Sequence, residues 1–132
     1  MPNPYPQRLA SLLELTVRAL EGERTDSRSL EDLQAGLTQL LDESSAVLPG
    51  ASPLHPGRVA QACLSTALPF LTAHTALREG LERARHLHVE LPLPPALMAQ
   101  GASQLAVHLL RTAHEYAEIW SRRLAQQEGR AA

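Results

Sequence analysis

Apolar side chains recur at steps of four and three along one long segment, and this pattern most constrains the fold. Such steps place side chains on one face of a helix, as in a coiled coil. They predict a helix from Gly57 or Arg58 to about Glu90. Pro69 lies inside it without a backbone donor, so we expect a kink or a break into two helices there. The positions of the stripe are Cys63, Ala67, Phe70, His74, Leu77, Leu81, Ala84, His88 and Leu91.

A second long helix is predicted from about Pro95 to Gln127, with two adjacent apolar stripes. One stripe is Leu105, Leu109, Thr112, Tyr116 and Ile119, and the other is Ala106, Leu110, Ala113, Ala117, Trp120 and Leu124. The connection Leu91-Pro-Leu-Pro-Pro95 is short, so the two long helices should be antiparallel neighbours. A turn centred near Leu93 would place Leu77 opposite Leu109, Leu81 opposite Leu105 and Ala84 opposite Ala102.

Two shorter helices precede the long pair. One is predicted from Pro6 to Glu21, and the other opens at Ser29, where Asp32 completes a variant of the capping box, and ends at Pro49-Gly50. The chain is therefore predicted to be all-α: an antiparallel bundle of four helices, or five if the third breaks at Pro69. Residues 1–6 form an extended Pro-rich arm, 7–127 a single bundle domain, and 128–132 a frayed tail.

Composition supports a helical fold and excludes several classes of protein. The chain has 25 Leu and 20 Ala against five Val, one Ile and four aromatic residues. A net charge of −2 does not favour binding to nucleic acid or an acidic membrane, and a single cysteine excludes a disulfide framework. No apolar run is long enough to cross a bilayer, and the first residues do not resemble a signal peptide, so we expect a cytoplasmic protein.

The lengths of the predicted helices indicate self-association. The first two helices span about 25–30 Å each, whereas the last two could each reach about 50 Å. Two short helices cannot cover a hairpin twice as long, yet its apolar stripes continue to both ends. Unless the third helix folds back at Pro69, a second copy should cover the remainder, and we expect a homodimer.

Among six histidines, His74 is the strongest candidate for a special role, because it occupies a position in the apolar stripe. It should hydrogen-bond Thr112 or Tyr116, which the predicted register places within reach. It is also a weak candidate for binding a ligand or cofactor. A metal site needs three or four ligands, and neither His108 nor His114 converges with it, so we expect no metal and no cofactor.

The segment Ala73-His-Thr-Ala-Leu-Arg-Glu-Gly80 loosely resembles the histidine phosphotransfer domains, which are helical bundles carrying Ala-His-x-Leu-Lys-Gly. The resemblance implies phosphorylation of His74. The segment departs from the family pattern at Leu77, where the family has Lys, and at Arg78, where the family has Gly. A phosphorylatable histidine must also be exposed, whereas His74 is predicted on the buried stripe.

The segment Arg83-Ala-Arg-His-Leu-His88 is similar to the motif of the HEPN ribonucleases, dimeric helical bundles in which four residues stand between an Arg and a His. The resemblance implies that Arg83 stabilises charge and His88 acts as acid or base in RNA cleavage at a dimer cleft. The motif here lacks the polar residue after Arg and does not lie in the last helix.

The function predicted from these observations is a non-catalytic protein-interaction module, an adaptor or small regulatory protein, with an unidentified protein as partner. The alternatives are a HEPN-like ribonuclease and a phosphotransfer or ligand-binding bundle. Interface candidates are the large side chains Trp120, Tyr116, Leu124 and Phe70, with Trp120 left open between core and interface. The absence of Lys beside abundant Arg, Ala, Leu and Pro is typical of a high-GC bacterial genome.

Overall fold

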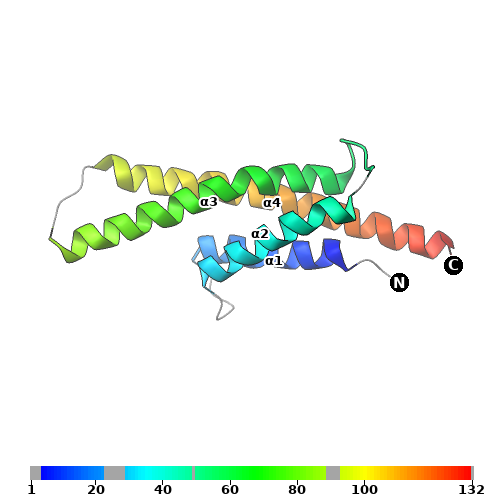
Figure 1. The fold of residues 1–132 in the computed structure, drawn as a ribbon, viewed down its shortest axis with the longest axis horizontal. Coiled ribbons are helices and arrows are strands. Elements are labelled where there is room, and N and C mark those ends of the chain that lie inside the picture. The colour runs from blue at the N-terminus through cyan, green and yellow to red at the C-terminus, as the bar shows by residue number, and fades with distance from the viewer. Residues whose placement is uncertain (1–3, 23–28, 49, 89–92, 132) are drawn as a thin grey trace.

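The part of the chain that the structure describes consists of four α-helices and their connections (Figure 1). The structure is a computed structural model, and it describes residues 4–22, 29–48, 50–88 and 93–131. The helices are α1 (Tyr5–Leu20), α2 (Leu30–Val47), α3 (Pro56–His86) and α4 (Leu93–Ala131). The all-α prediction is confirmed, and α3 and α4 share the largest contact, as the predicted long hairpin requires.

Local signals account for the ends of the two short helices. Ser29 is the N-cap of α2, and its hydroxyl oxygen accepts a hydrogen bond from the N–H of Asp32 at 3.2 Å, as the capping box predicts. Glu31 and Asp32 place negative charge in the first turn, where the helix dipole stabilises it. Just after the C-terminal end of α1, Gly22 has φ 84°, a left-handed conformation that favours glycine and ends a helix.

Helix α3 runs without interruption through Pro69, so the alternative of five helices is wrong. Proline removes one hydrogen bond, because the carbonyl of Ser65 loses its N–H partner four residues on. Both Ser65 and Pro69 are exposed. Water can therefore solvate the freed carbonyl, and the surrounding packing holds the helix together.

Neighbouring helices run antiparallel, and α1 and α2 lie together on one side of the α3–α4 hairpin (Figure 1). Helix α2 meets α3 through Gln34, whose amide donates to Thr72 at 2.7 Å, and through Ser44, which accepts from Gln61 at 2.6 Å. Helix α1 meets α4 in the same antiparallel sense. This arrangement is an up-and-down four-helix bundle.

The buried stripe of α3 is rotated relative to the one predicted. The most buried positions are Ala60, Leu64, Ala67, Leu71 and His74, whereas Cys63, Phe70, Leu77 and Leu81 are only partly buried. Two apolar stripes lie side by side on this helix, and spacing alone does not say which one faces the other helices. On α4, the alanine-rich stripe that ends at Trp120 is the buried one, and Leu105 of the neighbouring stripe is exposed.

The predicted register of the hairpin is also wrong. Nδ1 of His74 lies 3.0 Å from the carbonyl oxygen of Ala99, instead of facing Thr112 or Tyr116. In an antiparallel pair, a step of three residues back along α3 from His74 corresponds to three residues forward along α4 from Ala99. Leu71 therefore lies near Ala102, whereas the predicted register placed Ala84 opposite Ala102. The prediction centred the turn on Leu93, whereas α3 ends at His86 and Leu93 already opens α4.

At the end where α3 leads into α4, both helices of the hairpin extend past α1 and α2, and at the other end α4 alone extends past them (Figure 1). At 1.5 Å per residue, α1 and α2 are about 24 and 27 Å long, against about 46 Å for α3 and 58 Å for α4. Helix α1 begins at Tyr5, inside the predicted arm, and α4 continues to Ala131, through most of the predicted tail. Among the described residues, no helix is long and apolar enough to span a membrane.

Candidate interaction surface

His74 is buried and its hydrogen bond is internal. Only 9% of its surface is exposed. Since a carbonyl oxygen only accepts, the contact with Ala99 at 3.0 Å places a proton on Nδ1. The prediction of a buried, locally satisfied histidine is confirmed, with a different partner. Phosphorylation would require an accessible nitrogen, which this burial opposes.

Arg83 and His88 lie at the far end of the hairpin, and both are exposed. Arg83 belongs to the last turn of α3, and its carbonyl accepts a hydrogen bond from the N–H of Leu87. His88 follows the helix with φ 56°, a left-handed conformation that ends it. Within the described part of the chain, no hydrogen bond joins them.

Further histidines and the cysteine form no obvious chemical site. His114 lies 3.5 Å from Glu118 on the same helix, and His108 is exposed. Burial raises the pKa of the Cys63 thiol, which keeps it protonated and poorly nucleophilic. Among the described residues, no three His, Cys, Asp or Glu side chains group in a way that could hold a metal ion.

Trp120 lies in the core at the end of the bundle where α1 begins. It is 3% exposed, and its ring centroid lies 5.5 Å from that of Tyr5 and 5.6 Å from that of His55. The Tyr5 hydroxyl donates to the carbonyl of Leu40, which ties α1 to α2 at the same level. Burial raises the pKa of Tyr5 to about 12. The sequence leaves Trp120 open between a place in the core and a place at an interface, and the structure shows it in the core.

His55 has a structural role that the sequence analysis missed. It is the N-cap of α3, and its Nδ1 accepts a hydrogen bond from the N–H of Gly57 at 2.9 Å. Burial, with Arg123 and Arg58 nearby, lowers the pKa of its imidazole. The signal was present in the sequence as His55-Pro-Gly57, with proline at the first helical position. Histidine is not among the residues expected to cap helices, so this signal was not recognised.

The α3–α4 hairpin presents a long face on the side away from α1 and α2, which we call the outer face. Cys63 and Phe70 each lie two residues from a side chain that contacts α2, and two residues turn a helix by about 200°. By the same geometry, Leu109 lies opposite Arg111, which pairs with Glu21 of α1. The outer face includes Cys63, Phe70 and Leu77 of α3 and Leu105, Leu109 and Tyr116 of α4.

No acidic or basic residue interrupts this part of the hairpin. The sequence contains no Asp, Glu, Lys or Arg between Arg58 and Arg78, or between Glu90 and Arg111. Large apolar side chains remain exposed here: Leu105 is 49% exposed and Met98 61% exposed. Both uncharged stretches can be read directly from the sequence.

The predicted interface residues are divided between the core and the outer face. Phe70 and Tyr116 lie on the outer face and are partly buried. Leu124 is partly buried one turn beyond Trp120, on the core stripe of α4. An interface role for Phe70, Tyr116 and Leu124 stays a prediction.

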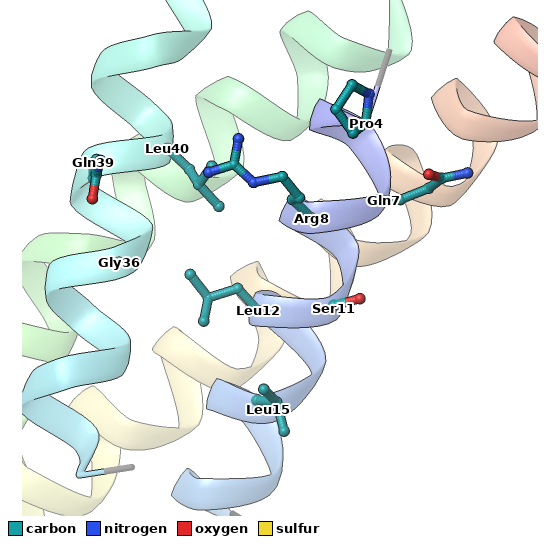
Figure 2. A pocket seen from close by; sticks show the side chains of 9 residues that line it. All are labelled: Pro4, Gln7, Arg8, Ser11, Leu12, Leu15, Gly36, Gln39 and Leu40. Carbon is teal, nitrogen blue, oxygen red and sulfur yellow. The ribbon is translucent and has the colours of Figure 1, made fainter. Parts of the chain in front are cut away.

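A hollow lies between α1 and α2, separate from the outer face (Figure 2). It has a volume of about 510 Å³. Leu12 points into it from α1, toward Gly36 of α2, while Arg8 extends across its upper part (Figure 2). A Cβ atom at Gly36 would lie 2.8 Å from Cδ2 of Leu12, so the absent side chain is what lets the two helices approach. Nη1 of Arg8 lies 3.7 Å from Oε2 of Glu43, an exposed ion pair between α1 and α2.

The described residues define a class of fold, an up-and-down four-helix bundle with a protruding hairpin and an uncharged outer face. No protein-family model, curated protein or solved structure matches the chain.

Proposed function

We propose that the protein is a non-catalytic interaction module, an adaptor or small regulatory protein, that works as a homodimer. The observation that carries this proposal is the excess surface of the single chain. Its accessible surface is 8471 Å², whereas a compact monomer of 14.4 kDa exposes about 6,800 Å². The hairpin that extends past α1 and α2 exposes apolar side chains, which favours association.

The side chains with potential chemistry are engaged or dispersed, which supports a binding role. The imidazole of His74 is buried and donates to a backbone carbonyl, and the Cys63 thiol is kept protonated by burial. Arg83 and His88 are both exposed, and among the described residues no hydrogen bond joins them. A bacterial source, predicted from composition, and a cytoplasmic location are part of this proposal.

Sedimentation equilibrium over a wide range of protein concentration tests self-association. We expect the measured mass to approach twice the 14.4 kDa of the single chain as concentration rises. A mass that stays at the monomer value up to millimolar protein would contradict the homodimer.

Incubation with labelled RNA tests the non-catalytic part of the proposal. We expect no cleavage by the wild-type protein. Cleavage that is lost in both Arg83→Ala and His88→Ala, with the helix content of each variant unchanged, would show a ribonuclease instead.

A further inference from the structure

We infer that the outer face of the α3–α4 hairpin is the homodimer interface, with the same face of a second copy of this chain as its occupant. This inference rests on the self-association proposed above and specifies the surface that carries it. It predicts a two-fold axis that lies in the plane between the two outer faces, so that the two hairpins pack against each other and α1 and α2 lie on the outside of the dimer.

The charge pattern of the outer face suits a surface that binds itself. A two-fold axis places one patch against its own copy, so a charged patch repels itself unless each charge meets its opposite. The outer face avoids this repulsion, since Arg58 and Arg78 bound an uncharged stretch of α3. Beyond Leu77, Leu81 and Ala84 continue this side of the helix. Depletion of charged residues is characteristic of the buried centre of interfaces, and homodimer interfaces are the most apolar.

The arrangement of α1 and α2 explains why the apolar surface is on this side. Both helices contact the hairpin from the opposite side, where Gln61, Thr72 and Arg111 supply polar contacts. The charged residues of the bundle can therefore lie on the surfaces around α1 and α2. The outer face is left with apolar side chains that no part of the described chain covers.

The size of the outer face matches what a stable dimer needs. From Val59 to Ala84 the uncharged side of α3 is about 38 Å long, and two adjacent helices are about 20 Å wide. The footprint is then about 750 Å², close to the roughly 800 Å² that each partner buries in a standard interface.

The outer face also has side chains suited to anchoring a partner. Phe70 and Tyr116 provide one aromatic ring on each helix, and both are already partly held by the core. Met98 and Leu105 are 61% and 49% exposed and can pack without repacking the monomer. Rigid aromatic side chains surrounded by aliphatic ones are typical of interface centres. A membrane surface fits less well, because it would call for basic residues beside the apolar stripe, and the outer face has none.

The substitution Leu105→Arg tests this inference, with Leu54→Arg as its matched control. Both replace an exposed leucine by arginine, but Leu54 is 87% exposed in the segment before α3 and does not belong to the outer face. Burying an unpaired guanidinium at the interface should weaken the dimer about 100-fold or more, measured as the dissociation constant by sedimentation equilibrium. Leu54→Arg should leave that constant within about two-fold of the wild-type value.

A second pair of variants keeps the test independent of any one side chain. Ala73 is exposed on the outer side of α3, and Ala35 is exposed on α2. Ala73→Glu should weaken the dimer, whereas Ala35→Glu should not. Circular dichroism should show the same helix content in all four variants, since none of these positions is buried.

The outcomes distinguish this inference from the proposal on which it rests. If the wild type is a dimer and both Leu105→Arg and Ala73→Glu remain dimeric, the outer face is not the interface, while self-association stands. If the wild type is a monomer at every concentration, both are overturned. Dissociation by Leu105→Arg and Ala73→Glu, with intact dimers in both controls, supports the inference.

Discussion

Nδ1 of His74 donates a hydrogen bond to the backbone carbonyl of Ala99, with 3.0 Å between the two atoms. This bond joins the two helices of the hairpin, α3 and α4. It satisfies a buried polar group at a position that the spacing assigns to apolar residues, and it sets which turns of α3 and α4 face each other. His74 is therefore a structural residue of the hairpin.

Replacing His74 should destabilise the protein more than replacing an exposed histidine. His74→Ala removes the hydrogen bond to Ala99 and leaves a small cavity, so we expect the free energy of unfolding to fall by about 1–3 kcal/mol in urea titrations. His108→Ala is the control, because His108 is exposed on α4, and it should change that free energy by less than about 0.5 kcal/mol. Equal effects of the two substitutions would show that the hydrogen bond is unimportant for stability.

Two glycines of α3 should respond in opposite directions to substitution by alanine. A Cβ atom at Gly57 would lie 2.7 Å from Leu48 and 3.0 Å from the Trp120 ring, whereas one at Gly80 would have no neighbour within 4 Å. Gly57→Ala should lower the unfolding temperature, because overpacking of about 1–3 kcal/mol outweighs the helix propensity gained. Gly80→Ala should raise it, by about 0.5–1 kcal/mol in stability. A stabilised Gly57→Ala variant would mean that Trp120 has room to move.

Substitution of Pro69 should stabilise α3. Pro69→Ala restores an N–H that can donate to the carbonyl of Ser65, and Pro69 is exposed, so little packing is lost. We expect a gain of about 1–3 kcal/mol in the free energy of unfolding, measured by chemical denaturation. Pro53→Ala, in the exposed segment before α3, is a control outside the helix and should bring no such gain. A destabilised Pro69→Ala variant would indicate that the proline shapes the helix for packing.

The cap formed by His55 should make stability depend on pH. The folded protein lowers the pKa of His55 below its unfolded value of about 6.5, chiefly through burial. The neutral imidazole, whose Nδ1 accepts from Gly57, therefore stabilises the fold above about pH 6.5. This contribution is lost as pH falls through the lowered pKa, because the unfolded chain takes up the proton first.

Thermal unfolding between pH 7.5 and 5 measures this effect. The wild-type melting temperature should fall more steeply with acidification than that of His55→Asn, since asparagine caps a helix without titrating in this range. His86→Asn, exposed at the other end of α3, should follow the wild-type profile. Parallel profiles for the wild type and His55→Asn would rule out a contribution from this cap.

The sequence predicted the features that depend on neighbours along the chain. The Ser29 cap follows from a side chain reaching a backbone N–H three residues on, and it is found as expected. The long hairpin follows from apolar spacing on either side of a short proline-rich connection. Each of these features depends on contacts within a few residues, so periodicity and propensity are sufficient to predict them.

Only the tertiary structure decided which stripe is buried, how the two long helices align, and what surrounds Trp120. On α3 both Phe70 and Leu71 belong to plausible apolar stripes, and Leu71 is the buried one because its side faces the other helices. The register of the two long helices depends on where the hairpin turns. Trp120 contacts Tyr5, which lies near the opposite end of the sequence. The sequence by itself thus determined the helices and the excess of apolar surface. Side-chain packing between segments far apart in the chain determined which part of that surface is left uncovered on the outer face.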